Sequence, residues 1–85
     1  MAAPDTGREP SSTLGAFGAA VRELRGERTL KDIAARADLH WTYISDVERG
    51  RKNPGFEAVV RLSRGLGVTP AELVQRFERH YQARA

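Results

Sequence analysis

The chain has 85 residues and no cysteine, which leaves room for one domain and excludes both a disulfide framework and a thiolate metal site. Lys and Arg total 14 against 11 Asp and Glu, a net charge of +3 that favours a polyanionic partner such as nucleic acid without selecting one. The apolar runs are far shorter than the ~20 residues that span a bilayer, and the N-terminus lacks the pattern of a signal peptide. We therefore expect a cytoplasmic protein with no membrane contact.

The N-terminal segment differs from the rest of the chain. Residues 1–11 mix Pro, Gly and charge with no periodic apolar face, and such a segment buries too little to offset the entropy of ordering it. We predict a flexible tail there and a folded domain over residues 12–82. Apolar residues recur at helical spacing from Leu14 to Leu24, which predicts a first helix that begins with Ser12 or Thr13 as its N-cap and ends near Gly26.

A second helix and a tight turn follow. Thr29 and Asp32 have the spacing of a capping box and predict a helix over residues 30–37. Asp38 tolerates the left-handed backbone conformation better than most residues, so residues 38–40 are expected to form a turn.

A third helix is predicted from Trp41 to Arg49, with Gly50 just past its end. Ile44 and Val47 form its apolar side. Two helices of about two turns each, joined by only three residues, must cross at a steep angle instead of lying antiparallel. The spacing therefore predicts a helix-turn-helix pair.

Two more helices complete the predicted fold. Apolar residues at helical spacing from Phe56 to Leu66 indicate a fourth helix, ended by Gly67 and weakened in its last turn by Gly65. Residues 69–72, Thr-Pro-Ala-Glu, combine an N-cap with a first-position proline and predict a fifth helix over residues 70–81. Because no segment has the pattern of a strand, the expected fold class is all-α, a compact five-helix domain.

The helix-turn-helix pair and its surroundings resemble a known family. Four stretches carry the similarity: Thr29–Ala34, Tyr43–Gly50, Asn53–Pro54 and Leu66–Val68. They are similar to the xenobiotic-response-element family of helix-turn-helix regulators, which includes phage repressors and Cro. Residues 39–40 and 42–50 resemble the controller proteins of restriction-modification systems in particular. The resemblance implies a lambda-repressor-like DNA-binding domain that acts as a sequence-specific transcriptional regulator, with the third helix in the major groove of double-stranded DNA.

The outer side of the third helix carries the residues expected to contact bases: Trp41, Thr42, Tyr43, Ser45 and Asp46. Thr42 suits a thymine methyl group, and Asp46 either accepts a hydrogen bond from a cytosine amino group or pairs with a neighbouring Arg. Trp41 either stacks on the DNA or covers the edge of the core.

A second group is expected to hold the phosphates: Arg22, Thr29, Lys31, Arg49, Arg51, Lys52 and Asn53. Basic residues cluster directly after the third helix, and the N-terminus of the second helix offers N–H groups and a positive dipole end. Leu30 stands where the family usually has Gln, so the phosphate contact of that Gln is not expected. Glu48 is expected to be structural and to hold the third helix to a neighbouring Arg or to a helix terminus, because a carboxylate gains nothing from DNA.

One such unit reads only a few base pairs, so a homodimer on a palindromic operator is expected. Leu73, Phe77 and Tyr81 on the fifth helix are the predicted dimer interface. The alternative is that Leu73 and Phe77 complete the core of the monomer.

Other functions lack the residues they need. The chain has no cysteine nucleophile, Gly-rich phosphate loop or plausible catalytic triad, so we expect no enzyme, no cofactor and no small-molecule substrate. His40 and His80 have no partners at metal-ligand spacing and are expected to be a turn residue and an exposed helix residue. The alternative function is an antitoxin or another protein-interaction module on the same helical fold.

Overall fold

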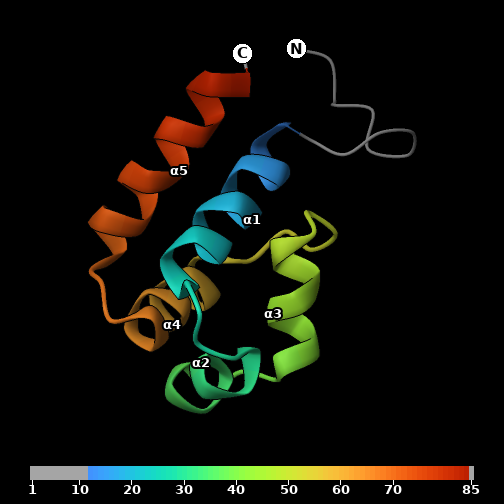
Figure 1. The fold of residues 1–85 in the computed structure, drawn as a ribbon, viewed down its shortest axis with the longest axis vertical. Coiled ribbons are helices and arrows are strands. Elements are labelled where there is room, and N and C mark those ends of the chain that lie inside the picture. The colour runs from blue at the N-terminus through green and yellow to red at the C-terminus, as the bar shows by residue number, and fades with distance from the viewer. Residues whose placement is uncertain (1–11, 85) are drawn as a thin grey trace.

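The computed structural model describes residues 12–84, and over these residues it contains five helices and no strand (Figure 1). The helices are α1 (Ser12–Arg25), α2 (Leu30–Ala37), α3 (Trp41–Glu48), α4 (Phe56–Leu66) and α5 (Pro70–Arg84). The all-α five-helix architecture expected from the sequence is confirmed. The tail predicted over residues 1–11 lies outside the described residues.

Most helix ends follow their predicted caps. Thr29 and Asp32 form the capping box of α2, with the Asp32 N–H donating to Thr29 Oγ1 at 3.0 Å. Thr69 and Glu72 form the same arrangement before α5, where the Thr69 N–H donates to Glu72 Oε1 at 2.8 Å. These bonds from the Thr69 backbone and hydroxyl lower the pKa of Glu72. Gly67 ends α4 in the left-handed region, at φ 80°.

Three helix ends differ from the sequence prediction. Ser12 and Thr13 lie within the first turn of α1 and do not precede it, and Arg49 is the C-cap of α3 instead of its last residue. The fifth helix continues to Arg84, past the end predicted near Tyr81. Gln, Ala and Arg after Tyr81 are good helix formers, so the helix continues through them.

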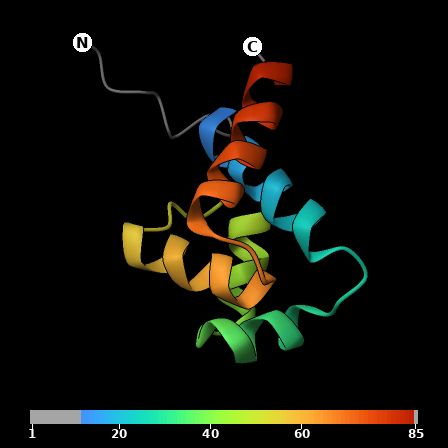
Figure 2. The same ribbon diagram turned by 90° about the vertical axis from the view of Figure 1, so that its left-hand side faces the viewer.

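A single core joins all five helices. α1 passes through the middle of the molecule, with α5 along one side of it and α3 on the other (Figures 1 and 2). The largest fully buried side chains come one or two from each helix: Val21, Ile33, Ile44, Val47, Leu62, Ser63 and Leu73. The buried Ser63 hydroxyl donates to the Val60 carbonyl at 2.7 Å, so its polar atom is satisfied.

α2 and α4 pack so closely that there is no room for a side chain at Gly65. A Cβ atom placed on Gly65 would lie 2.8 Å from both the Ala37 Cβ and the Ile33 carbonyl oxygen. Gly65 is therefore a packing residue that lets α4 support α2, and the prediction that it merely weakens the last turn of α4 misses this role.

α1 and α5 are joined by an apolar and a polar contact. The rings of Phe17 and Phe77 lie 6.3 Å apart at an interplanar angle of 56°, a favourable tilted geometry. Glu23 on α1 accepts from Arg76 Nη1 at 2.9 Å and contacts His80 Nε2 at 2.7 Å. His80 is thus a half-buried partner of α1, in contrast to the exposed helix residue expected.

Replacement of Gly65 by Ala should lower the free energy of unfolding by about 1–3 kcal/mol, because the added methyl group overlaps α2. Gly15→Ala is the matched control, since Gly15 also lies inside a helix and a Cβ placed on it would meet only the side-chain end of Arg84, at 3.4 Å. Urea unfolding measures both. Equal stability of the two variants would contradict the close crossing.

Glu23→Gln should make stability depend less on pH in the acid range. The hydrogen bond from His80, and after it the charge of Arg76, lower the pKa of Glu23 from 4.5. A lowered folded-state pKa adds stability above the unfolded-state pKa, and that stability is lost as pH falls through the folded-state pKa. Because the carboxylate is about half exposed, we expect the wild-type advantage to be below ~1 kcal/mol at neutral pH and to shrink in urea titrations as the pH falls below 4.5. An advantage that stays constant on acidification would contradict this.

Candidate nucleic-acid interface

α2, the turn and α3 form the helix-turn-helix pair that the spacing predicts. Asp38 takes the left-handed conformation at φ 56° and ψ 48°, and the Leu39 N–H donates to the Ala34 carbonyl at 3.1 Å. These two features end α2 within one residue. α2 therefore runs across the end of α3 and not alongside it (Figure 1).

The side chains of α3 divide into an inner and an outer set. Ile44 and Val47 are buried, at 0% and 1% exposed. Of the residues expected to contact bases, Trp41 is 42% exposed and Thr42 is exposed, while the remaining three are half-buried: Tyr43, Ser45 and Asp46. The Tyr43 ring packs partly against the core. The five residues therefore occupy one continuous outer surface of α3, on which Trp41 and Thr42 protrude most.

His40 caps α3, a role that the sequence analysis did not assign. Its Nδ1 atom accepts from the Thr42 N–H at 3.2 Å and lies 2.7 Å from Thr42 Oγ1. Its ring also stacks on Trp41, with centroids 6.1 Å apart and planes 25° apart. The Trp41 ring therefore packs on His40 instead of covering the core. The two aromatic rings extend the outer surface of α3 at its N-terminal end.

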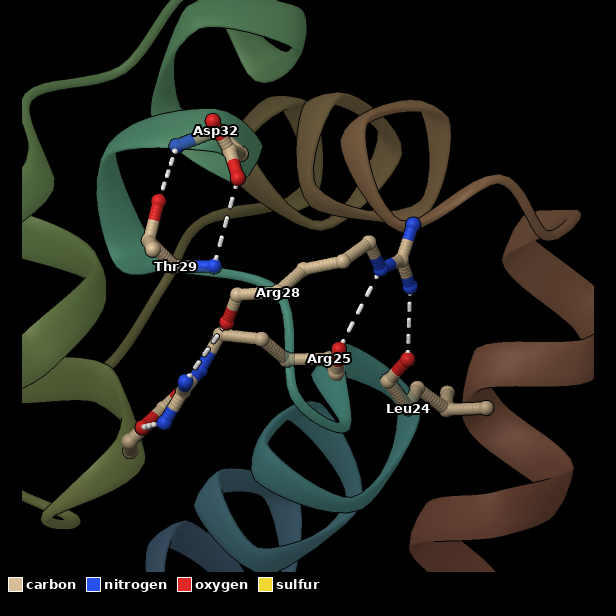
Figure 3. A network of polar contacts seen from close by, with 6 residues as sticks. Leu24, Arg25, Arg28, Thr29 and Asp32 are labelled. Carbon is tan, nitrogen blue, oxygen red and sulfur yellow. Dashed lines mark hydrogen bonds and ion pairs between the residues drawn. The ribbon is translucent and has the colours of Figure 1, made fainter.

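α1 holds the other end of α3. Arg25 and Glu48 form a two-bond ion pair, with Nε to Oε2 at 2.7 Å and Nη2 to Oε1 at 3.0 Å (Figure 3). Both side chains are largely buried, at 18% and 8% exposed. The hydrogen bond from Arg25 to Glu48 raises the pKa of Arg25. The structural role expected of Glu48 is confirmed.

Two further arginines stabilise the connections around the helix-turn-helix pair. Arg28 donates through Nη2 to the Leu24 carbonyl at 2.7 Å (Figure 3). The same Nη2 donates to the Leu66 carbonyl at 3.1 Å, which joins the ends of α1 and α4. Arg61 on α4 donates to the Asp38 carbonyl at 3.2 Å and so supports the turn. Neither role was predicted, because the carbonyls of Leu66 and Asp38 lie 38 and 23 residues away from the arginines that bind them.

The cations after α3 remain available at the surface. Arg49, Arg51 and Lys52 are exposed, and within residues 12–84 none of them forms an ion pair. Asn53, from the same loop, is also exposed. This loop, residues 49–55, is therefore a surface on which positive charge is not neutralised by the domain itself.

The other predicted phosphate contacts lie on α1 and at the start of α2. Arg22 and Lys31 are exposed. Arg22 follows Gly18 by one helical turn, and Gly18 packs on the backbone of Val47 and Glu48, so Arg22 is on the side of α1 that faces the end of α3. The Thr29 oxygen accepts within the capping box, which leaves only its hydroxyl hydrogen to donate to a phosphate.

The residues predicted for the dimer interface are not equivalent. Leu73 is 0% exposed and belongs to the core of the monomer, so its assignment to the interface is wrong. Phe77 is half-buried against Phe17, whereas Tyr81 is 43% exposed and its ring lies 5.5 Å from that of Phe77. Of these three residues of α5, Tyr81 and the exposed part of Phe77 are therefore accessible to a partner.

Other kinds of site find little support in the described part of the chain. Among residues 12–84 no cluster of three or more His, Asp or Glu side chains is placed to hold a metal ion. None of the helices described combines the length and the apolar character needed to cross a membrane.

Comparisons with known proteins agree with this geometry. The family model described as a helix-turn-helix domain matches residues 16–76. The control protein C.BamHI of Bacillus amyloliquefaciens is 39% identical over 61 residues, covering 68% of this chain and 75% of that protein. The HTH-type transcriptional regulator DdrOP3 of Deinococcus deserti is 45% identical over 60 residues, which are 68% of this chain but only 46% of that protein.

Solved structures show the same fold. The restriction-modification controller protein C.AhdI from Aeromonas hydrophila superimposes with a TM-score of 0.70 at 31% identity, covering 74% of this chain and 98% of that one. The controller protein C.Esp1396I, solved as a tetramer in complex with its natural 35 base-pair operator, gives a TM-score of 0.77 at 24% identity. It covers 85% of this chain and 97% of its own.

Glu48→Gln should destabilise the domain by about 1–3 kcal/mol, because the largely buried Arg25 guanidinium loses its charged partner. Glu57→Gln is the control, since Glu57 also pairs with an arginine but its side chain is 80% exposed; we expect a change below ~1 kcal/mol there. Thermal unfolding followed by circular dichroism measures both, and equal shifts would show that burial of the Arg25 pair adds nothing.

Proposed function

Because the chain belongs to the helix-turn-helix domain family, we propose that it is a sequence-specific DNA-binding transcriptional regulator that acts on a palindromic operator as a homodimer. The observation that carries this proposal is the outer surface of α3, which the domain holds at a fixed angle and leaves accessible. The loop of unpaired cations lies directly beside it. A groove reader needs both features on one face.

α3 is the element that we place in the major groove, with its N-terminal residues against the base edges. Thr42 is well positioned there, because the His40 contact at 2.7 Å orients its hydroxyl and leaves its methyl group to meet a thymine. Asp46 forms no ion pair within residues 12–84, which favours a base contact, such as acceptance from a cytosine amino group, over the alternative of pairing with Arg.

Phosphate contacts are assigned to the loop after α3 and to the ends of α1 and α2. Arg49, Arg51 and Lys52 are the strongest candidates because their charges have no partner in the described domain. Lys31 and Arg22 would extend the contact on either side of α3. Thr29 is a weaker candidate, since the Asp32 carboxylate at the same helix end repels a phosphate.

The dimer follows from the size of the reading surface. A single two-turn helix reaches only a few base pairs, and useful discrimination from random DNA takes a second copy on a neighbouring half-site. Phe77 and Tyr81 remain proposed as part of the interface. Among the relatives, C.Esp1396I is a tetramer on its operator, which supports self-association in this fold.

The proposal assigns no catalytic activity to the chain and places it in the cytoplasm, where DNA is accessible. The two named relatives are a control protein and a transcriptional regulator. Selection of bound fragments from a pool of random double-stranded DNA tests the proposal directly. Recovery of one palindromic motif supports it, and recovery of unrelated sequences would reject sequence-specific binding.

Two double variants should separate base contacts from phosphate contacts. Thr42→Ala with Tyr43→Phe removes two outer hydroxyls while the ring that packs on the core is kept, and it should weaken binding to the selected motif but not to random DNA. Arg51→Ala with Lys52→Ala should weaken binding to both and reduce the slope of log K against log salt by about 1.8, or 0.9 per phosphate contact.

Fluorescence anisotropy over a series of salt concentrations measures these effects. If the two double variants lost specific and random binding in the same proportion, the division of roles between α3 and the loop after it would be wrong.

A further inference from the structure

Phe56, the first residue of α4, is the most exposed large apolar side chain in the described part of the molecule. It is 83% exposed, although helical spacing placed it among the residues that define the apolar face of α4. It follows Gly55, the N-cap of α4, so it is held at a fixed helix start and projects from it. A phenyl ring in this position is a rigid apolar knob that the monomer does not cover.

An apolar groove lies beside this knob. α1, α4, α5 and the loop before α4 form its walls, with Leu14, Phe17, Pro54, Val59, Val74 and Phe77. Phe56 stands at its rim, and no charged side chain lines it. Its volume is about 280 Å³. An apolar cavity of about 150 Å³ is enough to hold benzene, so the groove is large enough for a phenyl ring.

We propose that this groove receives Phe56 of a second copy of the chain, so that two knobs and two grooves form the dimer interface. The inference rests on the proposed function, which calls for a dimer, and it specifies the contact. A two-fold interface requires that one patch carries both halves of each contact. Phe56 and the groove are adjacent on one face and meet that requirement.

The chemistry of the groove favours a second copy of the chain over DNA or a charged peptide. Its walls offer no cation for DNA phosphate or for an acidic peptide and no anion for a basic one. A second copy supplies an exposed phenylalanine of matching size. The two residues of α5 that remain proposed for the dimer interface fit this arrangement, because Phe77 is a wall of the groove and Tyr81 packs beside Phe77.

The size of the domain is compatible with this arrangement. A stable interface of standard size buries about 800 Å² per partner, roughly one seventh of the 5827 Å² surface. Phe56, Val74 and Tyr81 are the exposed large apolar side chains that such an interface would cover, at 83%, 49% and 43% exposed. With three such side chains from each copy, we expect an association in the micromolar range without DNA.

The dimensions of the domain are compatible with the spacing of two half-sites on DNA. Half-sites one helical turn apart, about 34 Å, require each α3 to lie about 17 Å from the two-fold axis. The two shorter extents of the domain are 23 and 22 Å, so a contact at one side of the molecule allows this distance. Asn53 and Pro54 line the groove and follow α3 closely in sequence, so the interface and the DNA-facing loop are continuous.

Sedimentation velocity of the full chain without DNA tests the proposal. The wild type should pass from monomer to dimer as its concentration rises through the micromolar range. Phe56→Ser removes the knob and Val74→Arg puts a charge in the groove, and each variant should remain monomeric. Trp41→Ser is the control: it removes another exposed ring, on α3, and should leave the dimer intact. Because Phe56 and Val74 are 83% and 49% exposed, all variants should retain the wild-type circular dichroism spectrum.

A mixture of the two monomeric variants gives the sharpest result. The Val74→Arg chain keeps its knob and the Phe56→Ser chain keeps its groove, so an equimolar mixture should form a heterodimer through one of the two contacts. A wild type that stays monomeric, variants that dimerise as the wild type does, or a mixture that shows no association would each overturn the proposal.

DNA affinity is measured separately, because it tests the proposed function and not the dimer contact. Phe56→Ser should still bind a single half-site of the selected motif. A wild type that binds no DNA would reject the proposed function instead.

Discussion

The position of α3 depends on its contact with α1. A Cβ atom on Gly18 would overlap the carbonyl oxygens of Val47 and Glu48, so the absence of a side chain at Gly18 allows the backbone of the last turn of α3 to rest directly on α1. The Arg25–Glu48 ion pair closes the same contact seven residues further along α1. The turn after α2 leads directly into the first turn of α3, and this contact with α1 fixes the other end of the helix.

Much of the fold follows from local sequence signals. The capping boxes at Thr29 and Thr69, the left-handed Asp38 and the 3.6-residue periodicity are local features, and each of them predicted an element that the structure confirms. A structural role for Glu48, toward an Arg or a helix terminus, was also expected, since a carboxylate gains nothing from DNA. These features are readable because the residues that make them are neighbours in the chain or carry an obvious unmet charge.

The remaining features depend on contacts that no local pattern reveals. Gly18 and Gly65 look like weak helix residues until the backbone that each one approaches is known. Arg28 and Arg61 bind carbonyls 38 and 23 residues away. Leu73, which was predicted to lie in the dimer interface, is buried in the core. Phe56, which the periodicity put on the apolar face of α4, is exposed at the surface. Helical spacing identifies which residues are apolar but not which of two apolar faces the domain covers.

The arrangement gives one domain two surfaces with different chemistry. The outer side of α3 and the cations after it are polar and charged, and suit a nucleic acid, whereas the groove beside Phe56 is uncharged and suits another protein chain. Residues 49–55 connect the two surfaces. A rigid connection between them would fix the spacing of the two α3 helices in a dimer, and this spacing decides which operators fit.

The amides on the outer side of α3 should respond strongly when DNA binds, because this side is proposed to meet the bases. A titration of the isotope-labelled protein with the selected duplex measures this response through the amide chemical shifts in NMR spectra. We expect the largest changes at Trp41, Thr42, Ser45 and Asp46, accompanied by changes in the loop after α3. Changes confined to α5, with α3 unaffected at saturation, would show that another surface meets the DNA.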